Sequence, residues 1–187
     1  IEKKDDSGQI RRQTFFIKLE TPMLKNTDSV AAPLINVPSD AAIIHGFIVE
    51  LAVYEKAEHE VEASVTEIKS SIFAADSPCN ALICELNGEA IGFAVYFYNY
   101  STWLGKKGLY LEDLYVSPKH RGLGAGKLLL RHLAQVAVEE GCGRFEWSVL
   151  DWNQPAIDFY DSVGAKPQAE WVKYRLAGND LLSFAKA

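Results

Sequence analysis

The sequence predicts an α/β fold in which a mixed β-sheet is flanked by helices. Apolar runs of strand length alternate along the chain with segments whose apolar residues recur at helical spacing. The pair Asn87-Gly88 separates two of these apolar runs, and because both residues tolerate positive φ it predicts a β-hairpin. The order hairpin, strand, helix, strand, helix, strand then requires a sheet with both antiparallel and parallel neighbours.

The 187 residues suit one domain with a full core, which we place at 31–187 behind an N-terminal extension at 1–30. The extension begins with charged and polar residues, so we expect it to be partly flexible, with one extra strand near 15–19. The elements expected next are a strand at 34–37, a helix opened by Asp40, a helix at 60–73 and hairpin strands at 81–86 and 90–98. An irregular stretch at 99–108 should precede a central strand at 109–116 and a helix at 127–140. A strand at 144–150, a short helix from Pro155 to Gly164 and a last strand at 171–176 should complete the domain.

Composition narrows the class of partner. The net charge is −6, whereas nucleic-acid binding requires a basic surface, so we expect no nucleic-acid partner. No apolar run approaches the ~20 residues of a membrane helix, and we expect no membrane partner. The first residue is Ile rather than Met, so a preceding targeting segment stays an alternative. The cysteines, Cys79, Cys84 and Cys142, form no C-x-x-C pair and favour a reducing, cytoplasmic setting, and the histidine spacing predicts no metal site.

The segment HRGLGAGK at 120–127 follows an expected strand and opens an expected helix. Glycines let a ligand approach the backbone closely, and helix-opening amides favour an anion such as a pyrophosphate. A dinucleotide fingerprint counted from Gly122 would need Gly where Lys127 stands, and a Walker A loop would need Ser or Thr at Leu128. We call residues 121–127 the phosphate loop; the alternative is a connector without a ligand.

Five separated motifs extend this signal: YSTWLG at 100–105, YLEDLYV at 110–116, RGLGAGK at 121–127, EWSVLDWN at 146–153 and AIDFYDSVGA at 156–165. Together with ELAVYE at 50–55, they resemble the spermidine/spermine, thialysine and plant-type diamine acetyltransferase branch of the GNAT superfamily, over roughly residues 34–176. The resemblance implies the GNAT acetyl-CoA N-acyltransferase fold and a homodimer. It also implies acetyl-CoA as co-substrate and, as acceptor, the primary amine of a small diamine, a polyamine or a thialysine-like amino acid.

Site residues follow from the same resemblance. Tyr160 would be the general acid, and Glu112 would assist the amine as a base and also bind it. The cofactor would contact Leu114, Tyr115, Val116, Arg121, Gly122, Leu123, Gly124, Ala125, Gly126, Lys127, Asn153, Gln154, Pro155, Ala156 and Tyr160. The acceptor pocket would be lined by Tyr54, Glu55, Trp103, Glu112, Glu146, Trp147, Ser148 and Glu170.

Several alternatives stay open. Tyr160 is also consistent with a core aromatic, and strand alternation would place Glu112 and Asp113 on opposite faces, which makes Asp113 structural. Ser101 stands where the spermidine/spermine enzymes carry an acid, which favours a shorter acceptor over a long polycation. Competing functions are a GNAT enzyme for another amine, such as an aminoglycoside or a protein lysine, and a non-catalytic CoA-binding module.

Overall fold

The structure is a computed structural model that describes residues 15–19, 34–35 and 38–187. The chain divides into two compact units, Ile1–Ser148 and Val149–Ala187, and each is described by itself. Apart from residues 15–19, the expected N-terminal extension lies outside the described residues.

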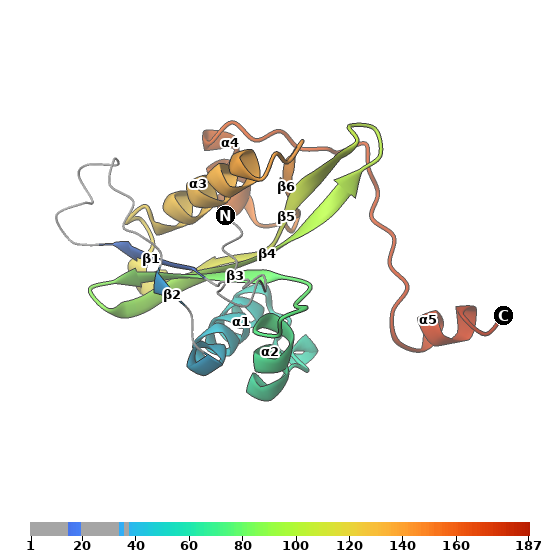
Figure 1. Cartoon of the computed structure of the whole chain (residues 1–187), viewed down its shortest axis with the longest axis horizontal. Coiled ribbons are helices and arrows are strands. Elements are labelled where there is room, and N and C mark those ends of the chain that lie inside the picture. Colours follow the sequence, from blue (N-terminus) through green and yellow to red (C-terminus); the bar gives the residue numbers. More distant parts are fainter. Residues whose placement is uncertain (1–14, 20–33, 36–37) are drawn as a thin grey trace, which may run out of the picture. The chain divides into compact units, whose positions relative to one another are not determined.

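Within the described residues, one six-stranded sheet has the order β2-β1-β3-β4-β5-β6 (Figure 1). The strands are β1 (Phe15–Leu19), β2 (Leu34–Ile35), β3 (Asn80–Leu86), β4 (Glu89–Ser101), β5 (Lys106–Val116) and β6 (Phe145–Trp147). β1 pairs in parallel with β3, and β5 with β6, while β1–β2, β3–β4 and β4–β5 are antiparallel. The predicted mixed sheet is therefore confirmed, and the extra strand near 15–19 with it.

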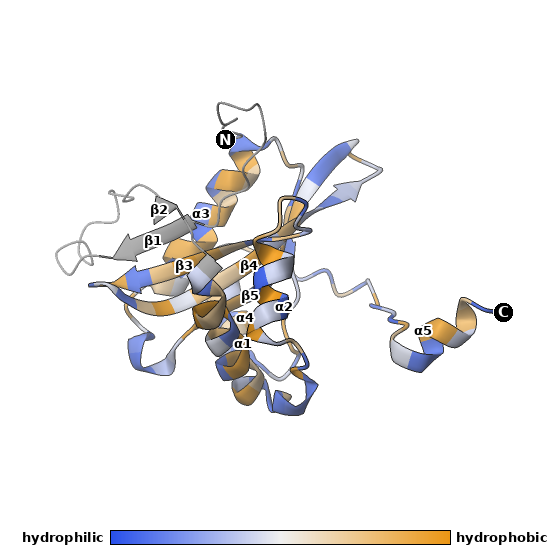
Figure 2. Cartoon of the chain, turned by 60° about the horizontal axis from the view of Figure 1, so that its bottom comes forward, coloured by the Kyte–Doolittle hydropathy of each residue, from blue (hydrophilic) through white to orange (hydrophobic). Residues whose placement is uncertain are grey.

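Helices cover both faces of this sheet. Helices α1 (Ala41–Glu55) and α2 (Val65–Ile72) lie on one face, and α3 (Ala125–Glu139) lies on the other (Figure 1). On the α1 and α2 face, the rings of Phe47 and Phe93 stack with centroids 5.7 Å apart, within a core that also holds Val95 and Tyr115. The side chains of Leu129 and Leu133 on α3 are fully buried, and Figure 2 shows the apolar residues along α1 and α3.

Local chemistry explains the element ends that position the site. Asn87 and Gly88 both have positive φ, 53° and 83°, so the predicted hairpin between β3 and β4 is confirmed. A capping box between Ser64 and Glu67 opens α2 at Val65, later than the expected start at residue 60. A short 3₁₀ helix, η3 (Glu58–Glu60), occupies the preceding residues.

Three strand expectations need correction. Residues 99–108 are not irregular, because β4 and β5 extend their ladder to the pair Ser101 and Lys106 around a turn with Gly105 at φ 62°. The strand expected at 144–150 is limited to Phe145–Trp147. Residues 171–176 form no strand, because they pair with no other strand among the described residues.

The C-terminal unit contains α4 (Gln154–Ser162) and α5 (Gly178–Phe184). Asn153 is the N-cap of α4, and its Oδ1 accepts a hydrogen bond from the backbone N–H of Ala156 at 3.4 Å. Gly164 follows α4 with φ 87°, which confirms the predicted end of this helix. None of the described helices is both long and apolar enough to cross a bilayer.

Candidate functional site

A β-bulge in β5 lies at the centre of the candidate site. Val95 and Tyr96 are consecutive on β4, but their partners on β5 are Asp113 and Leu111, so Glu112 is an extra residue without a partner in this ladder. A bulge interrupts the alternation of side chains between the two faces of a sheet. The expectation that Glu112 and Asp113 lie on opposite faces assumed regular alternation, which does not hold at the bulge.

The carboxylates of Glu112 and Asp113 at the bulge affect the pKa values of nearby groups. Burial, together with the negative charges of Glu112 and Glu55, raises the pKa of Asp113 to about 6. Burial raises the pKa of the Cys79 thiol, and the charges of Glu112 and Asp113 add to that rise. Burial also raises the pKa of Glu55, at the end of α1. The bulge thus gathers acidic groups on the α1 side of the sheet.

Beyond the bulge, β5 has one free edge. The pairing of β5 with β6 ends at Leu111 and Trp147, whereas the pairing with β4 continues to Val116. Residues 113–116 therefore have a ladder partner on one edge only, within the described residues. A free strand edge presents backbone N–H and C=O groups to an extended ligand. The stretch contains Leu114, Tyr115 and Val116, which were expected to contact a cofactor.

The phosphate loop has the backbone geometry of an anion site. Gly122 and Gly124 have φ of 78° and 86°, which only glycine adopts without strain. Gly124 is the N-cap of α3 and supplies no side-chain hydrogen bond, so the first-turn amides from Ala125 to Lys127 are not capped by it. These amides and the dipole of a helix of 15 residues favour a bound anion.

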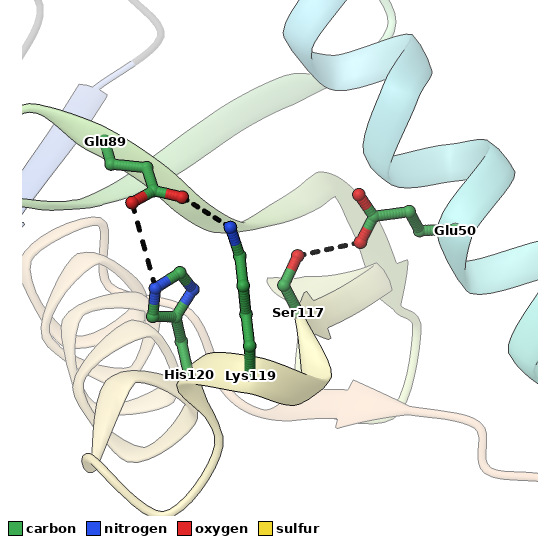
Figure 3. Close-up of polar contacts among 5 residues, drawn as sticks. All are labelled: Glu50, Glu89, Ser117, Lys119 and His120. Carbon is green, nitrogen blue, oxygen red and sulfur yellow. Dashed lines mark hydrogen bonds and ion pairs between the residues drawn. The ribbon is translucent and has the colours of Figure 1, made fainter.

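The turn that leads into the phosphate loop is held by two carboxylates (Figure 3). This turn is the 3₁₀ helix η4 (Pro118–His120), which follows Ser117. The Ser117 hydroxyl donates to Glu50 Oε2 of α1 at 2.7 Å. The Lys119 ammonium donates to Glu89 Oε1 of β4 at 2.6 Å, and His120 Nε2 lies 4.0 Å from Glu89 Oε2.

Arg121 is the first residue of the phosphate loop, and its side chain packs on aromatic rings. The guanidinium carbon lies 4.7 Å from the centroid of the Tyr54 ring and 5.6 Å from that of Tyr115. Its Nε donates to the Val116 carbonyl at 3.0 Å. The Tyr115 pKa is raised by burial and by a hydrogen bond to Glu50. Tyr54, expected in the acceptor pocket, is therefore in contact with the loop expected to hold the cofactor.

The residues expected in the acceptor pocket are divided between the two sheet faces. On β4, Val95 faces α1, so the next residue, Tyr96, faces α3. Tyr96 pairs with Leu111, and Leu111 pairs with Trp147. Because paired residues share a face, Trp147 lies on the α3 face. Glu146 lies on the opposite face, where its carboxylate is 2.9 Å from Arg144 Nε.

Other contacts fix two more of these residues. The Asn99 amide donates to Glu146 Oε2 at 3.3 Å, which adds to the Arg144 pairing. The Ser148 hydroxyl is hydrogen-bonded to the Tyr110 hydroxyl at 2.8 Å. Trp103 is 88% exposed in the turn between β4 and β5. Glu146 and Ser148 are thus held by partners in this structure, while the Trp103 ring faces solvent.

The remaining predicted residues belong to the C-terminal unit. Tyr160 lies on α4 with its ring 5.3 Å from that of Phe159, and it is partly buried. Asn153 caps α4 and is followed by Gln154, Pro155 and Ala156 in the first turn. Glu170 is exposed. The positions of these side chains are therefore given within the C-terminal unit.

Sequence reasoning missed Glu50, Asn99, Arg144 and the contribution of Asp113. Glu50 lies in the same ELAVYE motif as Tyr54 and Glu55, one helical turn before Tyr54, and this spacing was the available signal. For Asn99 and Arg144 no local signal exists, because the contacts join strands distant in sequence. Among the described residues, no group of three or more His, Cys, Asp or Glu is arranged to hold a metal ion.

Several known acetyltransferases are similar in sequence to this chain. A thialysine N-epsilon-acetyltransferase from Mus musculus is 35% identical over 158 residues, which cover 79% of this chain and 92% of the mouse protein. An L-ornithine N5-acetyltransferase from Arabidopsis thaliana is 45% identical over 95 residues, 51% of this chain and 42% of the plant protein. Spermidine/spermine N(1)-acetyltransferase-like protein 1 from Homo sapiens is 33% identical over 156 residues, 78% of this chain and 22% of the human protein.

Solved structures and a family profile agree as well. An integron cassette protein from V. cholerae superposes with a TM-score of 0.69 at 28% identity, covering 81% of this chain and 95% of that protein. The profile described as acetyltransferase (GNAT) family matches residues 45–165, which include most of α1, the bulge and the phosphate loop. The chain belongs to the acetyltransferase (GNAT) family.

Proposed function

We propose that the protein transfers the acetyl group of acetyl-CoA to a primary amine of a short diamine or of a thialysine-like amino acid. The arrangement of β5 carries this proposal. Its free edge begins at the bulge carboxylates and ends at Val116, four residue steps or about 13 Å away, and the turn 117–120 leads from there into the phosphate loop. An extended thioester arm along this edge, with its phosphates at the loop, would have its reactive end beside Glu112 and Asp113.

The chain's own groups fit the chemistry of amide formation. An alkyl ammonium has a pKa near ~10.4 and must lose a proton before its nitrogen attacks the thioester carbonyl. Glu112, exposed at the bulge, would accept that proton through water. Asp113, with its pKa raised to about 6, is a second proton acceptor within the same acidic group. A backbone N–H at the bulge would polarise the carbonyl, and Tyr160 would give a proton to the leaving thiolate.

Acetyl-CoA is the proposed co-substrate, and the residues present fit its phosphates. The phosphate loop offers strain-free glycines at positive φ and helix-opening amides without a side-chain cap. The contacts proposed for Arg121 to Lys127, for Leu114 to Val116 and for Asn153 to Ala156 follow the family motif. We propose no metal, because acyl transfer through these groups requires none.

A small acceptor is favoured by the charges that remain available. Glu146 is paired with Arg144 and also accepts from Asn99, so one expected cation anchor is partly neutralised. Ser101, which replaces an acid of the spermidine/spermine enzymes, is 6% exposed and accepts from the Leu104 N–H at 3.3 Å. The relatives from mouse and Arabidopsis are named for thialysine and L-ornithine, both diamino acids.

A homodimer in a reducing compartment such as the cytoplasm is the proposed setting, with no nucleic-acid or membrane partner. Residues 171–176 support the dimer, because Trp171, Val172 and Tyr174 are exposed there. All three cysteines are free thiols, which suits the cytoplasm. Sedimentation of the wild type and of a Trp171→Ser, Tyr174→Ser variant tests the dimer, which would be contradicted if both were monomers.

A thiol-release assay with acetyl-CoA tests the function. Putrescine, ornithine, lysine, thialysine, spermidine and spermine would be compared, with an aminoglycoside and a lysine-containing peptide as other amines. The proposal expects the highest kcat/KM for a short diamine or a diamino acid. It is wrong about the acceptor if spermine or a macromolecular lysine is best, and wrong about the activity if no amine releases thiol.

A further inference from the structure

The turn between β5 and the phosphate loop is attached to α1 through the side chain of Ser117, which lies outside the family motifs. Ser117 is the first residue after β5, and its backbone N–H donates to the Ile91 carbonyl of β4 at 2.9 Å. Its hydroxyl donates to Glu50 Oε2 at 2.7 Å (Figure 3). Ser117 is 6% exposed, so this hydrogen bond fixes a largely buried junction.

The same carboxylate reaches a second residue at the end of β5. The Glu50 carboxylate contributes to the raised pKa of the Tyr115 hydroxyl, and the centroid of the Tyr115 ring lies 5.6 Å from the Arg121 guanidinium carbon. Tyr54 lies one helical turn after Glu50 on α1 and carries the other face-on contact with Arg121. Glu50 therefore connects α1 to both sides of the loop entrance, at Tyr115 and Ser117.

A second carboxylate holds the same turn from the opposite side, but through a weaker contact. Glu89 pairs with Lys119, and the two side chains are 56% and 68% exposed. Exposed ion pairs contribute little and are screened by salt. Glu50 is also an exposed residue, but the Ser117 hydroxyl that donates to it is buried. This charge-assisted hydrogen bond is therefore screened less than the Lys119 pair, and we expect Glu50 to contribute more to the placement of the turn.

We propose that Glu50 is a positioning residue, which acts through Ser117 and Tyr115 to hold the phosphate loop in its cofactor-binding position against α1. This inference rests on the proposed function, because the ligand of the loop is taken to be acetyl-CoA. Glu50 is an anion near a site for anionic phosphates, so its charge alone would weaken cofactor binding. Positioning and charge repulsion therefore predict effects of opposite sign when the side chain is removed.

The test compares coenzyme A binding by calorimetry for the wild type, Glu50→Ala, Glu50→Gln and Ser117→Ala, well below each Tm. Glu50→Ala and Ser117→Ala should each raise the Kd about fivefold or more. The double variant Glu50→Ala, Ser117→Ala should have a Kd at most about twofold above that of either single variant, because both changes remove the same contact. Glu50→Gln retains an acceptor oxygen and should stay within about threefold of the wild type. At saturating acetyl-CoA, kcat should change by less than about twofold, since the loss lies in cofactor binding.

Two controls complete the design. Glu62→Ala removes an exposed carboxylate before α2 and should bind like the wild type. Glu89→Gln should raise the Kd less than about twofold and lose even that effect in 0.5 M salt. The inference is overturned if Glu50→Ala binds as tightly as the wild type or tighter, or if the Glu50 and Ser117 effects simply add. A wild type that binds no coenzyme A would instead overturn the proposed function.

Discussion

Arg144 Nε lies 2.9 Å from Glu146 Oε2, and the two residues are two positions apart at β6. The Asn99 amide donates to the same carboxylate oxygen. Glu146 was expected to bind the cationic acceptor, but a guanidinium already occupies one side of it. On the proposed function, this pair would reduce the negative charge that is left on the α1 face of the sheet for an ammonium group.

Replacing Arg144 by Met should release Glu146 for a distal ammonium group. We expect kcat/KM for spermine to rise about threefold to fivefold relative to putrescine, because one partly exposed ion pair contributes about 1 kcal/mol or less. Steady-state kinetics with both amines measure the ratio. The double variant Arg144→Met, Glu146→Gln is the matched control and should return the ratio to that of the wild type. An unchanged ratio in Arg144→Met would remove Glu146 from the acceptor site.

Replacing Gly124 by Val should weaken acetyl-CoA binding by about tenfold or more, because a β-branched residue at φ 86° costs about 1–2 kcal/mol or distorts the loop. Calorimetry with coenzyme A measures this loss. Gly141→Val is the matched control, because Gly141 has φ 66° beyond the far end of α3. It should lower the Tm similarly and leave the Kd unchanged; equal Kd values for both variants would argue against the loop as the phosphate site.

Replacing Tyr160 by Phe should lower kcat by about 10² while leaving the Kd for coenzyme A nearly unchanged, as expected for loss of a proton donor. Single-turnover acetyl transfer and calorimetry measure the two quantities separately. Tyr174→Phe removes a hydroxyl from a residue that is 91% exposed in the same unit and should have no effect. Unchanged turnover in Tyr160→Phe would return this residue to the core-aromatic interpretation.

Replacing Asp113 by Asn should change how stability depends on pH. Burial and the charges of Glu112 and Glu55 raise its pKa to about 6 in the folded chain, above the ordinary value of 3.8. The folded state then holds the proton more tightly than the unfolded state, so the contribution of Asp113 to stability is lost as the pH rises from about 4 to about 6. Asp113→Asn should be more stable than the wild type by about 1–2 kcal/mol at pH 7 and nearly equal to it at pH 4.

Urea unfolding followed by tryptophan fluorescence at both pH values measures this difference. The exposed Asp161, replaced by Asn, is the control and should give the same difference from the wild type at pH 4 and pH 7. An Asp113→Asn variant less stable than the wild type at pH 7 would contradict the raised pKa.

Features set by local backbone chemistry could be predicted from the sequence. The Asn87-Gly88 hairpin and the glycines at 122 and 124 are examples, because the required positive φ depends on the residue type itself. The mixed sheet also followed, since the order of apolar segments restricts the topology.

Long-range features could not be predicted in this way. The Ser117 and Glu50 contact joins residues 67 positions apart, and no local pattern specifies it. The apolar alternation at 171–176 is typical of a strand, but a strand needs a neighbour, which the pattern does not name. The bulge at Glu112 depends on how β5 registers against β4, so regular alternation misplaced Asp113.

That one extra residue also inverts the second half of β5. Leu109 and Leu111 pair with Tyr98 and Tyr96 on the α3 side, whereas Tyr115 pairs with Phe93 in the core under α1. An uninterrupted strand would put Leu111 and Tyr115 on the same face. The residues between Leu111 and Tyr115 are therefore constrained to keep the bulge. Deleting Glu112 would leave Asp113 directly after Leu111 and still opposite Val95, but it would remove the extra residue and its carboxylate. The turn at 102–105 carries no such constraint, so natural length variation in this hairpin should accumulate there and avoid residues 111–116.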